Sequence, residues 1–178
     1  MKRSRRSIDA ADLKKEYLAA WLNELGFEVD HDEDGDLRFD ISPFLWALLL
    51  IGEGMIELLI VERFQHLDES MGLRLVNQLN GRRFTPKWLL REEGRVICAY
   101  RYDWQGKVSF STFARVVRIF GATAARGYHW VEQADDSARR HKEEQATADQ
   151  DDRQDSKEAT PAESAEAGAA SNPSKTFH

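Results

Sequence analysis

The chain has 178 residues, one cysteine and a formal net charge of −6, which leaves room for one domain of ordinary size. Cys98 stands alone, which excludes an internal disulfide framework, and few histidines lie near it, which argues against a structural zinc site; a reducing, cytoplasmic compartment fits best. From Gln133 onward the chain has eleven acidic and six basic residues, whereas the rest has 20 acidic and 19 basic ones. The earlier part is therefore near neutral, so its charge gives no case for a nucleic-acid binder.

Composition divides the chain into three regions. Residues 1–6 are basic and are expected to be flexible, and residues 7–132 are expected to fold as one domain. Residues 133–178, rich in Ala, Ser, Glu and Asp, hold a single large apolar residue, Phe177, and are predicted to be a disordered acidic tail, although 134–145 could extend the preceding helix. The polar residues after the basic start argue against a secretion signal, and Glu53 and Glu57 argue against a membrane span over 44–61.

The first half of the domain begins with a helical pattern and then changes to strands. Apolar residues at helical spacing predict a helix over 8–25, capped by Asp9 and stopped by Gly26. Alternation around an Asp-Gly turn predicts a β-hairpin over 27–41. Two apolar runs, 44–51 and 55–64, are separated by glycines and are predicted to form two paired strands.

The second half repeats this alternation of helix and hairpin. A helix is predicted over 68–79, with Asp68 as its N-cap and Gly81 just past its end. A hairpin follows over 86–92 and 95–103, and a third helix, capped by Ser109 or Ser111, is predicted to run to about Val131. The whole is an α+β fold in the order α-β-β-β-β-α-β-β-α, with three helices and an antiparallel sheet of five or six strands.

We find no catalytic, metal or cofactor constellation in the sequence. Residues 30–35 (DHDEDG) match the opening of a calcium loop, but Ile41 stands where the closing glutamate belongs, so a hairpin turn is the preferred interpretation. Cys98 lies mid-strand and is predicted to be a buried small hydrophobe. A basic cluster at 82–91 beside Phe84 and Trp88 is interpreted as a solvated sheet edge.

The most informative feature is that several strands are apolar on both faces. Three helices cannot readily cover both faces of such a sheet, so an apolar surface is predicted to remain for a homodimer partner or a protein client. The alternative is that the third helix or the N-terminal segment covers the second face. The candidate contacts are Trp46, Leu48, Leu50, Leu59, Val61, Trp88 and Tyr100. A second hypothesis is a small-ligand or nucleotide-binding pocket built from Tyr100, Tyr102, Trp88 and Arg91.

Residues 22–131 resemble the YbjN-like family, whose members are similar in fold to type III secretion chaperones. The resemblance lies in the order of elements, in LGFEVDHDEDGDL at 25–37, in LVNQLN at 75–80, and in the hairpin 87–102 that leads into a Phe-rich final helix. It implies a non-enzymatic bacterial protein that dimerises and binds other proteins, as a sensory-transduction regulator or chaperone-like factor. The resemblance supplies no catalytic residues.

Overall fold

The computed structural model describes residues 6–52, 54–82, 86–104 and 106–158. The chain divides into two compact units after Arg140. The fold described below is that of the first unit, which contains all strands of the described residues and the sheet-covering part of the last helix.

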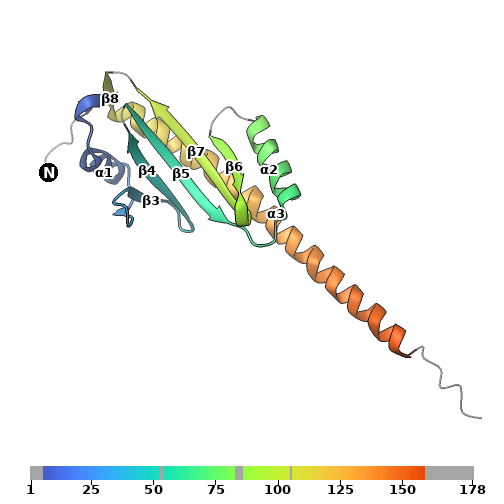
Figure 1. Ribbon diagram of the computed structural model, residues 1–178. Helices are drawn as coiled ribbons and strands as arrows, with labels where there is room; N and C mark the ends of the chain where they lie inside the picture. Colours follow the sequence, from blue (N-terminus) through green and yellow to red (C-terminus); the bar gives the residue numbers. More distant parts are fainter. Residues whose placement is uncertain (1–5, 53, 83–85, 105, 159–178) are drawn as a thin grey trace, which may run out of the picture. The chain divides into compact units, whose positions relative to one another are not determined.

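A six-stranded antiparallel sheet is the centre of the fold (Figure 1). Its spatial order is β2-β3-β4-β5-β7-β6, and every neighbouring pair is antiparallel. The strands are β2 (Val29–His31), β3 (Leu37–Ser42), β4 (Leu45–Gly52), β5 (Met55–Arg63), β6 (Lys87–Arg91) and β7 (Arg95–Asp103). The predicted α+β class and the predicted hairpins are therefore confirmed.

Three α-helices complete the predicted order: α1 (Lys15–Glu24), α2 (Glu69–Arg82) and α3 (Phe110–Glu158). Asp68 caps α2 as predicted, since its Oδ1 accepts a hydrogen bond of 2.8 Å from the Met71 backbone N–H. Ser109 caps α3, with its Oγ accepting from the Thr112 N–H at 3.2 Å. Short polar side chains at these positions satisfy backbone donors that the first helical turn leaves open.

The first helix is shorter than the sequence predicts. Ser7–Asp9 is instead a strand, β1, which pairs with β8 (Lys107–Ser109) in a small second sheet and is followed by a 3-10 turn over Ala10–Asp12. Ile8 is buried in this pairing, and Asp9 makes no side-chain cap. The long-range strand partner overrides the local helical spacing, and such a partner is invisible to periodicity.

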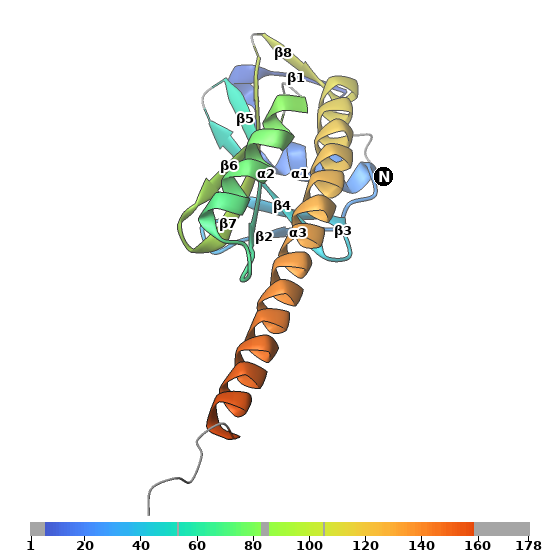
Figure 2. The same ribbon diagram turned by 90° about the vertical axis from the view of Figure 1, so that its right-hand side faces the viewer.

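One face of the six-stranded sheet carries the main core. Trp21 of α1 packs on Phe113 of α3 with ring centroids 5.5 Å apart, and Phe120 of α3 lies 6.5 Å from Tyr100 of β7. In Figure 1, α3 runs behind the strands. Figure 2 shows α2 lying along β6 at the sheet edge, where the Asn80 amide makes two 2.8 Å hydrogen bonds to the Trp88 backbone.

The last helix is longer than expected. It continues to Glu158, whereas the sequence predicts an end near Val131, or at most an extension over 134–145, and disorder beyond. Asp135, just past the predicted end, ties the helix to the α2 side of the domain, because its Oδ1 accepts hydrogen bonds from the backbone N–H groups of His66 and Leu67 at 2.7 and 2.8 Å. Extending an existing helix avoids the cost of nucleation, and the Ala, Gln, Glu and Arg residues here are good helix formers. The rest of the predicted tail, 159–178, lies outside the described residues.

Candidate functional site

Strand register gathers the apolar outward-facing residues of four strands on one surface. Leu48 pairs with Leu59, which pairs with Ala99 on its other side, and Val61 pairs with Ile97, which pairs with Leu89. Directly paired residues of an antiparallel sheet point to the same face. We call this surface the open face, and its apolar members are Trp46, Leu48, Leu50, Leu59, Val61, Leu89, Ile97 and Ala99.

The open face is accessible although its members are apolar. Trp46 is 44% exposed, Val61 46% and Leu89 41%, while the other five members are half-buried against one another. Their chain neighbours on the opposite face, such as Leu49, Leu58 and Ile60, are at most 1% exposed. Within the described part of the chain the helices lie on the other side of the sheet or at its edge (Figures 1 and 2).

Charged side chains of both signs surround this apolar surface. Along β3, Arg38 lies 2.9 Å from the Asp30 carboxylate and stacks over the Trp46 ring at 4.5 Å from its centroid. The hydrogen bond from the His31 backbone N–H, and after it the one from Arg38, lower the pKa of Asp30. Further pairs are Arg101 with Asp103 at 2.9 Å and Arg95 with Glu93 at 3.1 Å. An apolar centre with a mixed charged rim is the anatomy of protein interfaces.

Trp88 and Tyr100, predicted as contacts, lie on the covered face instead. Trp88 is only 2% exposed and its ring lies 5.0 Å from that of Tyr128 in α3. A Cβ added at Gly127 would lie 2.1 Å from this ring, so the missing side chain is what lets α3 rest on Trp88. Tyr100 pairs with Leu58 and is half-buried. Neither residue is available to a partner on the open face.

The open face also contains residues that sequence reasoning missed. Leu89, Ile97 and Ala99 belong to it by register, and none of them was among the predicted contacts. The signal was present in β7, where Arg95, Ile97, Ala99, Arg101 and Asp103 share one face and place charges at both ends of an apolar pair.

The residues of the predicted small-ligand pocket do not converge. Tyr100 and Tyr102 point to the covered face, where Tyr102 lies 5.8 Å from Trp104, while Arg91 is exposed. Arg91 lines a hollow of about 790 Å³ beside the start of α2, and that hollow contains none of the three aromatic residues. The pocket hypothesis is therefore left without its binding residues.

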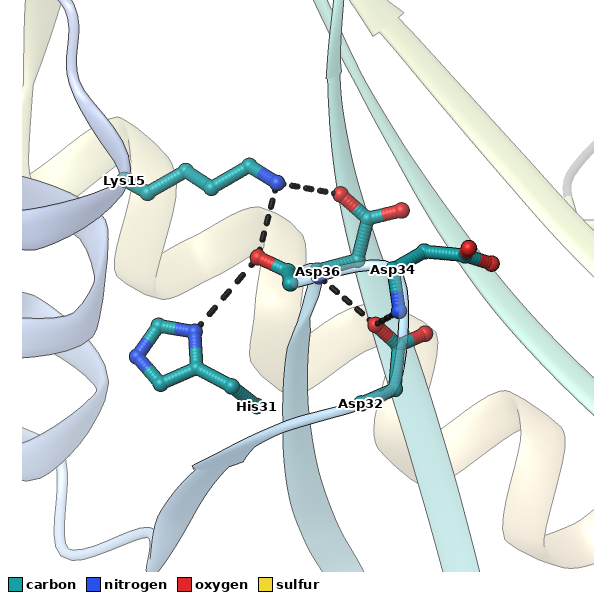
Figure 3. A network of polar contacts seen from close by, with 6 residues as sticks. Lys15, His31, Asp32, Asp34 and Asp36 are labelled. Atoms are coloured by element: carbon teal, nitrogen blue, oxygen red, sulfur yellow. Dashed lines mark hydrogen bonds and ion pairs between the residues drawn. The ribbon is translucent and has the colours of Figure 1, made fainter.

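The calcium-like segment is a hairpin turn closed by a lysine (Figure 3). Asp32 Oδ1 accepts hydrogen bonds from the backbone N–H groups of Asp34 at 3.1 Å and Asp36 at 2.7 Å. Lys15 of α1 donates to the Gly35 carbonyl at 2.8 Å and to the Asp36 carboxylate at 2.6 Å. The Lys15 ammonium group thus binds oxygens that a metal ion would need as ligands. Among the described residues no group of three or more His, Cys, Asp or Glu could hold a metal.

The Cys98 thiol and the Tyr128 hydroxyl are part of the core. Cys98 is fully buried, and burial raises the pKa of its thiol, so the thiol stays protonated. The Tyr128 hydroxyl lies 2.9 Å from the Ile60 carbonyl oxygen and 2.8 Å from that of Val96, and burial raises its pKa as well. Of the predicted basic cluster, Arg83 and Phe84 lie outside the described residues.

No helix among the described residues combines the length and the apolar character needed to cross a membrane.

Comparisons with known proteins agree with this architecture. The model of the YbjN family, described as "putative bacterial sensory transduction regulator", matches residues 14–133. No curated protein matches the chain.

Similar solved structures support the fold. YbjN from E. coli, described as "a putative transcription regulator", has a TM-score of 0.55 and 18% identity over 65% of this chain and 88% of that one. An uncharacterized protein from Methanothermobacter thermautotrophicus has a TM-score of 0.52 and 13% identity over 68% and 98%. The Yersinia pestis type III secretion chaperone SycH, in complex with a fragment of YscM2, has a TM-score of 0.43 and 13% identity over 65% and 97%, too loose to bear on function.

Proposed function

Because the chain belongs to the YbjN family, we propose that it is a non-enzymatic regulatory domain that binds protein through the open face of its sheet. The occupant that this surface fits best is a second copy of the same chain, which makes the domain a homodimer. The proposal places the protein in the cytoplasm, in keeping with its one unpaired, buried cysteine.

The observation that carries the proposal is the accessibility of the open face. Trp46, Val61 and Leu89 come from three different strands, and each keeps more than two fifths of its surface exposed. Single exposed apolar residues are ordinary, but a contiguous row across neighbouring strands marks an interaction surface. At about 25 cal/mol per Å² of apolar area, covering such a row favours association.

Charge and symmetry favour a second copy as the occupant. A two-fold interface uses the same patch on both subunits, so the patch must be complementary to itself. The rim supplies both signs close together, with Arg63 and Arg95 beside Glu93, and Arg101 beside Glu57 in the strand register. Two such rims can therefore face each other without like charges being forced together.

Trp46 is the expected energetic centre of the interface. It combines large area with a cation held over its ring, Arg38, and it is among the most exposed apolar residues of the face. Tryptophan and arginine are the residues on which binding energy most often concentrates. Both side chains are already held together in the isolated domain, which lowers the entropy lost on binding.

We propose no catalytic activity because the Cys98 thiol and the Tyr128 hydroxyl are enclosed in the core. Cys98 is buried under α3, and the Tyr128 hydroxyl is engaged with two sheet carbonyls. No titratable group with a shifted pKa lies in a hollow together with an acid–base partner, which is the arrangement a catalytic centre requires, within the residues the structure describes.

Sedimentation of matched lysine variants tests the proposal. Val61 on the open face and Leu73 on α2 are each 46% exposed, so Val61→Lys and Leu73→Lys change equally accessible aliphatic residues. A lysine in a buried interface loses its hydration, and Val61→Lys is expected to weaken the dimer by about a hundredfold or more. Analytical ultracentrifugation at rising concentration should show a dimer for the wild type and Leu73→Lys, and a monomer for Val61→Lys. A wild-type chain that stays monomeric to high micromolar concentration would overturn the homodimer.

A further inference from the structure

The outer face of α3 has a composition that the open-face proposal leaves unexplained. Between Phe110 and Val131 the helix contains three arginines and no acidic residue or lysine. The apolar residues of this stretch, such as Phe113, Val117 and Phe120, are buried against the sheet. The positive charge is therefore confined to the side of the helix that faces solvent.

These arginines line up along the helix. Arg115, Arg118 and Arg126, together with Ile119 and Ala122, fall on one exposed stripe at spacings of three, four and seven residues. Arg115 and Arg126 are eleven positions apart, which corresponds to about 17 Å of helix. Among the described residues none of the three arginines forms an ion pair, whereas Arg6 nearby is paired with Glu24 at 2.8 Å.

An apolar hollow lies at the N-terminal end of this stripe. It has a volume of about 410 Å³ and is lined by Leu25, Phe110, Ser111, Ala114, Arg115, Arg118 and Ile119. Ile119 is 51% exposed, the most exposed large apolar residue of α3 that the structure describes. The volume is within the range of small binding pockets, about 300–1,000 Å³, and easily receives one bulky side chain.

We infer that this stripe binds an acidic amphipathic segment of another protein. One apolar side chain of the segment enters the hollow beside Ile119, and its carboxylates pair with Arg115, Arg118 and Arg126. Arginine suits this role because its planar guanidinium can bind a carboxylate through two hydrogen bonds. A helical segment matches best, because it repeats its side chains at the same spacing as the stripe.

The same observations disfavour a nucleic acid or an anionic membrane as the partner of the stripe. Nucleic-acid binders commonly neutralise six to ten phosphates, about two to three times the charge available here. A helix that lies on a membrane needs a wide apolar face, but the apolar face of α3 is already enclosed by the sheet, and Ile119 alone is not sufficient. A shallow, mainly apolar hollow lined by two arginines instead fits an apolar side chain flanked by carboxylates.

Fluorescence titration with a defined probe tests the inference. The probe is a short alanine-based helical peptide with one leucine flanked by glutamates on the same face, and its matched control has glutamine in place of each glutamate. The wild type should bind the glutamate peptide at least about tenfold more tightly than the control. Arg115→Gln combined with Arg118→Gln should remove this preference, while Arg74→Gln, an exposed arginine on α2, should retain it.

Two further measurements separate the apolar from the charged contribution to peptide binding and compare the peptide with other polyanions. Ile119→Ser should weaken binding of both peptides to a similar extent, because it removes the apolar wall and leaves the charges. Duplex DNA and vesicles containing phosphatidylglycerol serve as competing polyanions. Absence of binding to the glutamate peptide, equal binding by the double glutamine variant, or tighter binding of DNA or vesicles would overturn the inference. Because the open face is unchanged in these variants, their sedimentation reports separately on the homodimer.

Discussion

The two faces of the same sheet have similar apolar content and very different surroundings. On the covered face of β5, Ile56, Leu58 and Ile60 are at most 1% exposed, whereas Val61 on the open face is 46% exposed. The covered face meets α1 and α3, whereas none of the described helices lies on the open face. Apolar character therefore predicts that a strand face will be covered, but it does not predict whether a helix of the same chain or a partner covers it.

The strands differ in how clearly they mark the two faces. In β4 neither alternate set is polar, so the sequence alone cannot say which side meets the helices. In β3 and β7 it can, since Arg38 and Asp40 point one way and Leu37 and Phe39 the other. Paired residues on neighbouring strands point to the same face, and β4 pairs with β3. The polar pattern of β3 therefore assigns the two faces of β4 once the register is known.

The sharpest test of the difference is alanine at two adjacent leucines of β5. Leu58 is fully buried and Leu59 half-buried on the open face. Leu58→Ala should lower the free energy of unfolding by about 2–5 kcal/mol, because it opens a cavity in a packed core. Leu59→Ala should cost less than about 1.5 kcal/mol at concentrations where the chain is monomeric. Urea unfolding followed by circular dichroism measures both, and equal losses would contradict the assignment of faces.

A smaller effect is expected where α3 touches the covered face most closely. Gly127→Ala puts a methyl group into the Trp88 ring and should cost about 1–3 kcal/mol through overpacking. Gly81→Ala in α2 is the matched control, since a Cβ there meets open space. This control should leave stability unchanged or raise it by up to about 1 kcal/mol. Thermal unfolding of the two variants separates the effect of helix propensity from that of contact.

The smallest predicted effect concerns the polar group inside the covered face. Tyr128→Phe removes the hydroxyl that serves the Ile60 and Val96 carbonyls and should cost about 1 kcal/mol near neutral pH.

The same tyrosine makes the free energy of unfolding fall at alkaline pH. Burial raises the pKa of Tyr128, so the folded state keeps the proton when the unfolded chain, with a pKa of about 10, releases it. The contribution of Tyr128 to stability is therefore fully present below about pH 10 and is lost as the pH rises further. Tyr128→Phe should lose stability less steeply than the wild type between neutral pH and about pH 11, which unfolding curves at each pH would show.

Much of the fold could be predicted because its signals are local. The Asp-Gly and Glu-Gly turns, the Asp68 and Ser109 caps and the apolar stripe of α3 depend on neighbours within a few residues. The pairing of β1 with β8 and the Lys15 contacts with the turn at Asp32–Asp36 depend on residues far apart in sequence.

Of the candidate site, the apolar face could be predicted and its full membership could not. The five contacts on β4 and β5 follow from composition, whereas Trp88 is not a contact, because Gly127 leaves room for its ring beneath α3. A side chain that is large and apolar satisfies the pattern of a core residue and of a contact equally well. Only the position of α3 distinguishes the two.

The most direct test of the central claim is the reactivity of a thiol placed in the open face. Ala99→Cys lies between Leu59 and Lys87 in the sheet, and Ala122→Cys on the outside of α3 is its control, while the native Cys98 is buried and gives little background. Maleimide labelling of Ala99→Cys should slow as protein concentration rises, and that of Ala122→Cys should not. If the Ala99→Cys rate stays constant while sedimentation shows a dimer forming, the chain associates through another surface and the account is wrong.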